Sequence, residues 1–471
     1  MELNGSIVAF LENKSILVTG STGFLGKVFV EKLLRVQPDL KHLFLILRAP
    51  DPTMAARRLH SEVLGKEVFN VLRTKCGVGF DTFISEKVTP VAGDTALKNF
   101  GLADDSDLLN KLLKDVDVVA HFAATTKCDE RYDVALEVNT MGAKNVLEFA
   151  KKCTKVQTVV HVSTVLDIDE ELKLAQIRLN ELKVGQVSEN EEKDAMQVFG
   201  TQRARLFGWP NTYTFTKAMG EMLIGKLGEN APIVIIRPTI VTSTYKEPFS
   251  GWSEGVRTID RFIVAAARGK LPCFLGNIRT IFDLVPWDMV VNAMMVAMVR
   301  HANKSTSSGP FICHLCSSKT EPVNSTKLRD YVYDYFTKNP LIGRDGKPIK
   351  TIKPARLPSM ASFRRHVFLS YKIPLKALQL VNVVSCHYLH DTCKNMKRKI
   401  DRTVRMVNSI NLTYSSKESI FEDSNTERLR TTISANKVEE NAFYCDPKCI
   451  DWNDYFMNIH FPGLVKYVIK L

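Results

Sequence analysis

Short apolar runs alternate with stretches of helical spacing along the first half of this chain. Residues 15–18 and 42–48 are two such runs, and residues 27–36 between them repeat apolar side chains every three or four positions. Unbroken apolar runs of this length are typical of strands that are buried on both faces of a sheet. The first 48 residues therefore predict a strand, a helix and a second strand.

The same alternation continues as far as residue 237. Four more apolar runs follow, at residues 87–94, 116–122, 158–163 and 232–237, with a helical stretch at 142–152. Strands that alternate with helices predict an α/β fold with a doubly wound parallel sheet of the Rossmann type. A charged, helix-rich stretch at residues 167–205 leads us to expect substrate-binding extensions on this sheet.

Beyond about residue 318 the alternation fades, and basic and aromatic residues become more frequent. We place a domain boundary near residue 355, with the sheet domain at residues 1–355 and a smaller, mostly helical domain at residues 356–471. A length of 471 residues suits two or three domains. The longest apolar stretch after the boundary, residues 367–384, contains two lysines and a proline, so we expect no membrane span.

The composition is that of a folded protein, with 45% apolar and 24% charged residues. The net charge of +13 suits a phosphate-rich ligand, an anionic membrane or nucleic acid. The basic C-terminal part has no recognised nucleic-acid module, so we expect no nucleic-acid partner. Two interpretations of this part stay open: peripheral contact with an anionic membrane, and a basic surface packed on its own core.

Ten cysteines are scattered along the chain, and its first residues lack the pattern of a signal or transit peptide. We therefore expect reduced thiols and a cytoplasmic protein. Two pairs, Cys313 with Cys316 and Cys445 with Cys449, have a spacing that zinc ligands use. The first pair lies in an alternating, strand-like run, in which Cys313 and Cys316 would point to opposite faces. We therefore predict no metal site.

A glycine-rich run lies between the first predicted strand and the first predicted helix, in the order G-x-x-G-x-x-G. Its glycines let a pyrophosphate approach the backbone, and the helix N-terminus presents unpaired N–H groups to that anion. A turn without a ligand is the alternative, and the strand-helix-strand setting favours a dinucleotide. The predicted contacts are Gly20, Ser21, Thr22, Gly23, Phe24, Leu25 and Gly26.

Arg48 ends the second predicted strand, where NAD-selective sites place an acid against the ribose 2′-hydroxyl. A guanidinium pairs with a 2′-phosphate, so Arg48 predicts NADPH as the cofactor. Asp94, at the end of the third strand, is a candidate acceptor for the adenine amino group. Ala123 and Ala124, after the fourth, allow the backbone to pass close to the cofactor. Ordinary loop chemistry is the alternative for these last three residues.

Tyr213 and Lys217 stand four residues apart, on one face of a predicted helix. Reduction of a carbonyl by hydride needs an acid for the emerging alkoxide, and a cation beside a tyrosine eases the loss of its proton. Lys217 would supply that cation and bind the nicotinamide ribose. Thr164 or Ser163, at the end of the fifth predicted strand, would help to bind the oxyanion.

In this chain order, the glycine turn, the Ser-Thr pair and the Tyr-x-x-x-Lys motif resemble the extended short-chain dehydrogenase/reductase superfamily. Longer stretches narrow the resemblance to plant alcohol-forming fatty acyl-CoA reductases, over nearly the whole chain. They are TGSTGFLG at 19–26, DERYDVALEVNTMGAKNVLEFAKKC at 129–153, HVST at 161–164, GWPNTYTFTKAMGEM at 208–222, VIIRPTIVTST at 234–244, EPFSGW at 247–252, DLVPWDMVVNAM at 283–294, NTERLR at 425–430, DPKCIDWNDYF at 446–456 and HFPGL at 460–464.

The resemblance implies reduction of a long-chain fatty acyl-CoA to a primary alcohol by two NADPH, through an aldehyde, for wax, cuticle, suberin or pollen-wall lipid. It makes Tyr213 the proton donor and Lys217 its partner. Thr164, with Ser163 beside it, becomes the oxyanion ligand. It also implies a location in the cytoplasm or at the cytosolic face of the endoplasmic reticulum, and it leaves acyl-chain preference and oligomeric state open. Two further residues complete the predicted cofactor contacts, Asn139 and Pro238.

This chain departs from the family pattern directly after the Ser-Thr pair. Family members continue with Ala-Tyr-Val and a long loop, whereas here Thr164 is followed by Val165 and Leu166, so a substantial segment is missing. One alternative is therefore a catalytically silent member that binds lipid or nucleotide. Another is a different extended short-chain reductase, such as a sugar-nucleotide epimerase or a hydroxysteroid dehydrogenase, against which Arg48 and the C-terminal resemblance argue. His121, unusual for the family, is expected to be structural.

Overall fold

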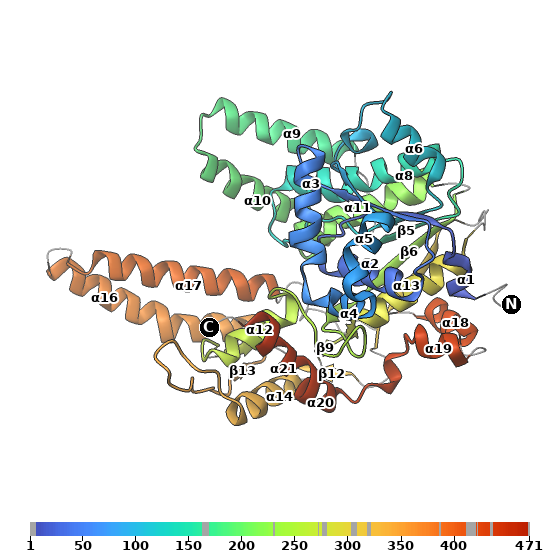
Figure 1. Ribbon diagram of the computed structural model, residues 1–471. Helices are drawn as coiled ribbons and strands as arrows, with labels where there is room; N and C mark the ends of the chain where they lie inside the picture. Colours follow the sequence, from blue (N-terminus) through green and yellow to red (C-terminus); the bar gives the residue numbers. More distant parts are fainter. Residues whose placement is uncertain are drawn as a thin grey trace.

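The centre of the molecule is a sheet of seven parallel strands in the order β11-β6-β5-β4-β1-β2-β3 (Figure 1). The structure is a computed structural model that describes residues 6–162, 169–228, 231–271, 273–275, 280–302, 309–317, 322–385, 388–410, 421, 423–433 and 437–469. The seven strands are β1 (Ser15–Thr19), β2 (His42–Leu47), β3 (Val88–Ala92), β4 (Val118–His121), β5 (Thr158–Val162), β6 (Ile233–Pro238) and β11 (Phe311–Leu315). Six of them coincide with the six predicted apolar runs, which confirms the doubly wound α/β fold.

Each face of the sheet has its own apolar core, because successive side chains of a strand point to opposite faces. Val18 of β1 belongs to the larger core, and its neighbour Leu17 belongs to the second. The larger core contains side chains of α1 (Ile7–Leu11), α2 (Phe24–Val36), α12 (Thr258–Ala267), α13 (Trp287–Arg300) and α14 (Ser325–Lys338). The second contains side chains of α6 (Asp107–Asp115), α8 (Gly142–Lys152) and α11 (Thr212–Leu227). The helices predicted at 27–36 and 142–152 are α2 and α8.

Two long helices extend from the second face, in the charged region that was expected to be helical. They are α9 (Asp169–Val184) and α10 (Glu189–Leu206), and they pack on a smaller apolar cluster that includes Tyr132 and Phe215 (Figure 1). The remaining connections hold short elements: α3 (Pro52–Arg58), α4 (Asn70–Cys76), α5 (Phe80–Lys87), α7 (Tyr132–Ala135), the π-helix η5 (Leu136–Met141) and the strand pairs β7 (Ile240–Thr242) with β10 (Leu284–Pro286), β9 (Ile281–Phe282) with β12 (Val323–Asn324), and β8 (Cys273–Leu275) with β13 (Ala355–Leu357).

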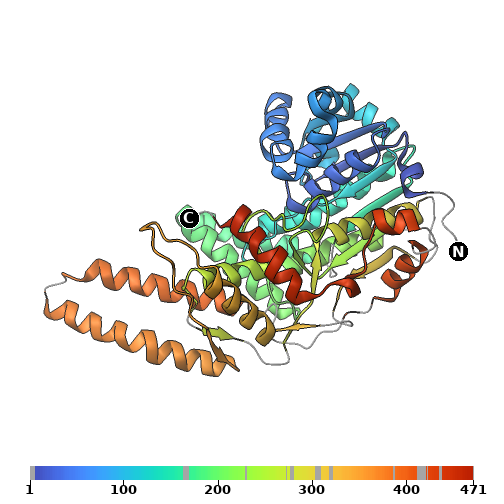
Figure 2. The same ribbon diagram turned by 60° about the horizontal axis from the view of Figure 1, so that its bottom comes forward.

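A helical hairpin projects from the body after β13. Its first arm is one continuous helical run, made of α15 (Met360–Val367), the π-helix η6 (Phe368–Lys372) and α16 (Ile373–Val384), and α17 (His390–Ile410) returns beside it (Figures 1 and 2). The proline of this run, Pro374, is the second residue of α16 and follows the π-helix closely. By length and composition the run could cross a membrane, with a mean hydropathy of 1.3 and 17% of its most apolar window buried. That it does not span one stays a prediction.

The last part of the chain returns to the sheet domain and joins its core. It contains α18 (Ser424–Ile433), α19 (Lys437–Ala442), α20 (Trp452–Asp454), the π-helix η9 (Tyr455–His460), α21 (Phe461–Gly463) and the π-helix η10 (Leu464–Val468). Phe443, Tyr455 and Phe461 are buried in the same apolar cluster as α2 and α13. Figure 2 shows this segment (red) lying along the body. The domain boundary near residue 355 stays a prediction.

Candidate active site

The glycine turn between β1 and α2 has no room for a side chain at Gly20 or Gly26, because other backbone atoms lie too close. Gly20 has a φ of +73°, and a Cβ there would lie 2.5 Å from the Ala123 nitrogen. Gly23 caps α2 without a side-chain hydrogen bond, which leaves the first helical N–H groups for an anion. Ser21 Oγ is buried with no hydrogen-bond partner among the described residues. The turn therefore fits a pyrophosphate.

The other predicted residues of this turn differ in where their side chains lie. Phe24 is buried, and its ring stacks on that of Trp252 with centroids 4.5 Å apart, so the side chain belongs to the core. A contact of Phe24 with the cofactor would involve its backbone. Thr22 and Leu25 are half-buried, and Gly26 packs against the backbone of Gly20.

Arg48 directly follows β2, and Asp94 and the Ala123–Ala124 pair follow β3 and β4 after one intervening residue. Because these strands are parallel, all four residues lie at the carboxyl edge of the sheet, where doubly wound folds bind ligands. Arg48 is exposed, whereas Asp94 is half-buried and accepts a hydrogen bond from the Ala96 nitrogen at 3.0 Å. The edge thus presents a guanidinium and a carboxylate on neighbouring strands.

Asn139 connects this edge to α11. Its buried amide accepts a hydrogen bond from the Thr125 nitrogen at 2.9 Å and donates one to Thr216 Oγ1 at 2.9 Å. Thr125 follows the alanine pair, and Thr216 stands between the two residues of the Tyr-x-x-x-Lys motif. Asn139 therefore holds the motif helix against the loop after β4, and a direct contact with the cofactor stays a prediction.

Tyr213 and Lys217 lie in the first turns of α11, whose N-cap Asn211 accepts a hydrogen bond from the Thr214 nitrogen at 2.9 Å. Lys217 is 5% exposed, and burial lowers its pKa to about 8, although the charge of Glu221 acts to raise it. Burial raises the pKa of Tyr213 to about 12, and the nearby Cys128 adds to the rise. Tyr213 is thus protonated at neutral pH, as a proton donor must be.

Glu221, one turn after Lys217, had not been singled out in the sequence. Its carboxylate forms a buried ion pair with Arg237 of β6, and the same guanidinium lies 2.9 Å from His314 Nε2 on β11. This pairing fixes the carboxylate that stabilises the charged form of Lys217. No local sequence pattern indicates this pair, because Glu221 and Arg237 are sixteen positions apart in the chain.

Two buried histidines end β4 and β5 side by side. The rings of His121 and His161 stack with centroids 5.0 Å apart, and Thr19 Oγ1 lies 2.6 Å from His121 Nδ1. His121 Nε2 and both nitrogens of His161 have no hydrogen-bond partner within the described part of the chain. Burial lowers the pKa of His121 to about 3, and the charge of Lys217 lowers the pKa of both rings. Both are therefore neutral near the motif helix.

Ser163 and Thr164, the predicted oxyanion ligands, lie outside the described residues, directly after the end of β5. Pro238 ends β6, the next strand, and is half-buried. Cys313 and Cys316 are both buried. Across the part of the chain that the structure describes, no group of three or more His, Cys, Asp or Glu residues is arranged to hold a metal ion.

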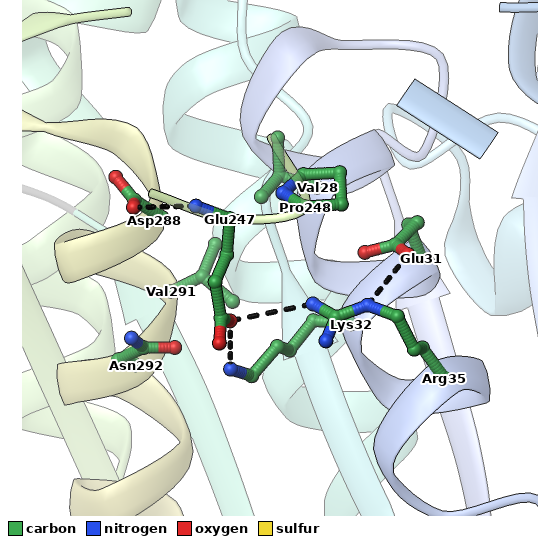
Figure 3. A pocket seen from close by; sticks show the side chains of 9 residues that line it. All are labelled: Val28, Glu31, Lys32, Arg35, Glu247, Pro248, Asp288, Val291 and Asn292. Carbon is green, nitrogen blue, oxygen red and sulfur yellow. Dashed lines mark hydrogen bonds and ion pairs between the residues drawn. The ribbon is translucent and has the colours of Figure 1, made fainter. Parts of the chain in front are cut away.

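A second polar cluster lies between α2 and α13 (Figure 3). Lys32 and Arg35 of α2 both pair with Glu247, while the Glu247 nitrogen donates to the Asp288 carboxylate of α13 at 3.0 Å. The crevice that these residues line has no space for a water molecule. The cluster therefore joins three segments and does not offer a substrate site.

This chain is similar to known proteins over its full length. Two family profiles match, both described as male sterility protein: an NAD-binding profile over residues 18–294 and a second, called Sterile, over residues 370–471. "Probable fatty acyl-CoA reductase 4" of Arabidopsis thaliana is 45% identical over 99% of this chain and 100% of its own length. "Alcohol-forming fatty acyl-CoA reductase" of Simmondsia chinensis is 44% identical over the full length of both chains.

Solved structures support the fold. The terminal R domain of the myxalamid pathway covers 97% of this chain and 93% of its own, with a TM-score of 0.55 and 15% identity. The reductase domain of a non-ribosomal peptide synthetase from Mycobacterium tuberculosis covers 98% and 96%, with a TM-score of 0.55 and 17% identity. With the full-length plant relatives, these findings confirm the resemblance drawn from the sequence. The chain belongs to the plant fatty acyl-CoA reductase family.

Proposed function

We propose that this chain reduces long-chain fatty acyl-CoA to a primary alcohol with NADPH, through an aldehyde. The observation that carries the proposal is the bridge made by Asn139, which ties the loop after β4 to α11 and so brings Tyr213 and Lys217 to the carboxyl edge of the sheet. Family membership supports it, because relatives named as fatty acyl-CoA reductases match over the full length. The alcohol product would be used to make wax, cuticle, suberin or pollen-wall lipid. The cytoplasm or the cytosolic face of the endoplasmic reticulum would be the location.

The residues of the site divide the chemistry between them. Two molecules of NADPH, bound in turn, would supply one hydride to the thioester carbonyl and one to the aldehyde that remains after CoA leaves. Tyr213 donates a proton to the alkoxide at each reduction, since its raised pKa keeps the phenol neutral until then. Lys217 would bind the cofactor ribose, and its positive charge would favour the phenolate as it develops. The glycine turn binds the pyrophosphate.

Arg48 supports NADPH over NADH within this proposal. Its exposed guanidinium follows β2, where a 2′-phosphate would lie and where an acid would select NAD. Arg58 is engaged elsewhere, with Glu62 and the Arg48 carbonyl.

Product analysis tests the proposal. Purified protein is incubated with NADPH and saturated acyl-CoAs of increasing chain length, and alcohol and aldehyde are quantified for the parent, Tyr213→Phe and Tyr333→Phe. Tyr333 lies on α14, and Tyr333→Phe serves as the control. We expect alcohol from the parent and from this control. Alcohol should fall about a hundredfold or more in Tyr213→Phe, because no acid meets the alkoxide. Equal product from all three would contradict the assignment of Tyr213.

A second candidate, a silent member that binds NADPH without turnover, rests on a difference in length. The alignment with the Simmondsia relative spans 496 positions, 25 more than the 471 residues of this chain. The missing segment was expected directly after Thr164, beside the site. Saturable NADPH binding by the parent, with no alcohol or aldehyde from any acyl-CoA, would select this candidate.

A further inference from the structure

The α16–α17 hairpin ends in a patch of exposed apolar side chains. Near the end of α16 and the start of α17, Leu380, Val381, Val383, Val384 and Tyr388 are exposed, with Val384 at 86% and Tyr388 at 88%. We call these five residues the hairpin tip. Figures 1 and 2 both show this end of the hairpin projecting away from the sheet. The tip is therefore an apolar surface held at a distance from the body.

The tip is not part of the hairpin's own core. That core is a separate cluster in which Leu375 of α16 and Ile400 of α17 are buried together with Phe363. The side chain of Asn382 is buried at the tip, where its Oδ1 accepts a hydrogen bond from the Leu389 nitrogen at 2.8 Å. This bond joins the end of α16 to the segment just before α17, close to the exposed apolar residues.

The hairpin also concentrates the positive charge of the chain. Residues 360–410 contain ten Lys and Arg, two Asp and no Glu, which makes +8 of the total +13. Lys394, Lys397 and Arg398 are exposed in the first turns of α17. At 1.5 Å per residue they lie roughly 6–12 Å along the helix from its start at the tip. Cations at that distance match the headgroup layer when an apolar end enters a bilayer by about 5–10 Å.

We propose that the hairpin docks the protein on an anionic membrane surface, with the tip inserted in the interface and the α17 cations on the lipid headgroups. Charge complementarity favours this occupant, because a second copy would bring the same +8 against itself. A full crossing is disfavoured, since α17 would carry its cations into the hydrocarbon. The inference goes beyond the proposed function and does not rest on it.

Vesicle sedimentation of the full chain, without substrate or cofactor, tests this inference. The vesicles are phosphatidylcholine alone or phosphatidylcholine mixed with phosphatidylserine. Leu380→Asp/Val384→Asp is compared with Leu206→Asp/Val184→Asp, which makes the same substitutions on α10 and α9 at matched exposure: 69% and 86% in the tip, 70% and 84% in the control. We expect the parent and the control to bind the anionic vesicles, less so at high salt, and the tip variant to bind about tenfold more weakly.

Several outcomes would overturn the proposal. They are a parent that binds neither vesicle, a parent that binds both equally, and a tip variant that binds like the control. A parent dimer without vesicles that the tip substitutions dissociate would assign the tip to a second copy of the chain. Membrane retention through an alkaline carbonate wash would mean that the hairpin spans the bilayer.

Discussion

The arginines near the carboxyl edge of the sheet differ in whether their side chains already form ion pairs within the protein. The Arg48 guanidinium is exposed, whereas Arg58 pairs with Glu62 on the same helical segment. We expect Arg48→Ala to raise the KM for NADPH by roughly tenfold to a hundredfold and to leave that for NADH unchanged, because a charge-assisted pair with the 2′-phosphate is lost. Arg178→Ala, at a partly exposed arginine of α9 that pairs with Glu181, serves as the control. An equal rise in KM for NADPH and NADH would show that Arg48 does not bind the 2′-phosphate.

Lys217 makes cofactor binding depend on pH. Its pKa is lowered to about 8, whereas that of Tyr213 is raised to about 12. In the free protein the positive charge of Lys217 is present below pH 8 and is lost as the pH rises through that value. We expect kcat/KM for NADPH to fall with a midpoint near pH 8, far below the titration of Tyr213.

Glu221→Gln tests the assignment of that midpoint. The Glu221 charge raises the pKa of Lys217, so its removal should move the midpoint to lower pH, by roughly half a unit to one unit. Glu148→Gln is the control, because this carboxylate is half exposed on α8 and pairs with Lys144. A midpoint that stays in place or moves to higher pH would mean that another group controls the decline.

Elements differ in how far the sequence predicts them. The six strands β1 to β6 were predicted because strands buried in a parallel sheet are mostly apolar, although β3 also contains the half-buried Thr89 and Pro90. The glycine turn and the Tyr-x-x-x-Lys pair were predicted because their members are neighbours in the chain. The Asn139–Thr216 bond spans 77 residues, and no local pattern encodes it. Pro374, one of the residues on which the prediction of no membrane span rests, does not break the helical run, and a π-helix lies directly before α16.

The junction of α2 with the segment before α12 gives a prediction for stability. Lys32 is 2% exposed and pairs with Glu247, and its Nζ also donates to the Ala442 carbonyl. Glu247→Gln leaves a buried ammonium without its carboxylate, so we expect the free energy of unfolding to fall by about 3–5 kcal/mol in urea titrations. The double variant Lys32→Met/Glu247→Gln should recover most of this loss.

The pH dependence of the same variant checks its cause. Burial lowers the pKa of Lys32, and Glu247 raises it, so the pKa falls further in Glu247→Gln. At pH values above this folded-state pKa, the unfolded chain binds more protons than the folded one, so the stability of the variant rises with pH. The loss of stability caused by Glu247→Gln should therefore become smaller as the pH rises. Glu62→Gln, which removes the partly exposed partner of Arg58, should cost within about 1 kcal/mol. A defect that grows with pH would exclude an unpaired ammonium as the reason.

Across the whole molecule, the C-terminal segment completes the core of the sheet domain. His460 of η9 lies 2.9 Å from Ser243 Oγ through Nδ1 and 3.1 Å from Asp260 Oδ1 through Nε2. These three residue types also form hydrolase triads, in which the serine is reachable by substrate and bonds to Nε2. Here the serine contacts Nδ1 and the aspartate contacts Nε2, and all three side chains are buried. The group therefore holds the last part of the chain to the segments after β7 and in α12.

This long-range bond predicts that the body of the protein depends on its last residues. His460→Ala removes the partner of two buried polar groups, so we expect a loss of about 2–4 kcal/mol in the free energy of unfolding and release of the C-terminal segment to protease. His390→Ala, at the exposed start of α17, should leave both measurements unchanged. Tyr455→Phe removes the hydroxyl that bonds to Thr242 Oγ1 at 2.8 Å but keeps the buried ring, so it should cost less than His460→Ala. If His460→Ala unfolds at the same urea concentration as the parent, the segment adds nothing to the stability of the sheet domain, and the two parts fold independently.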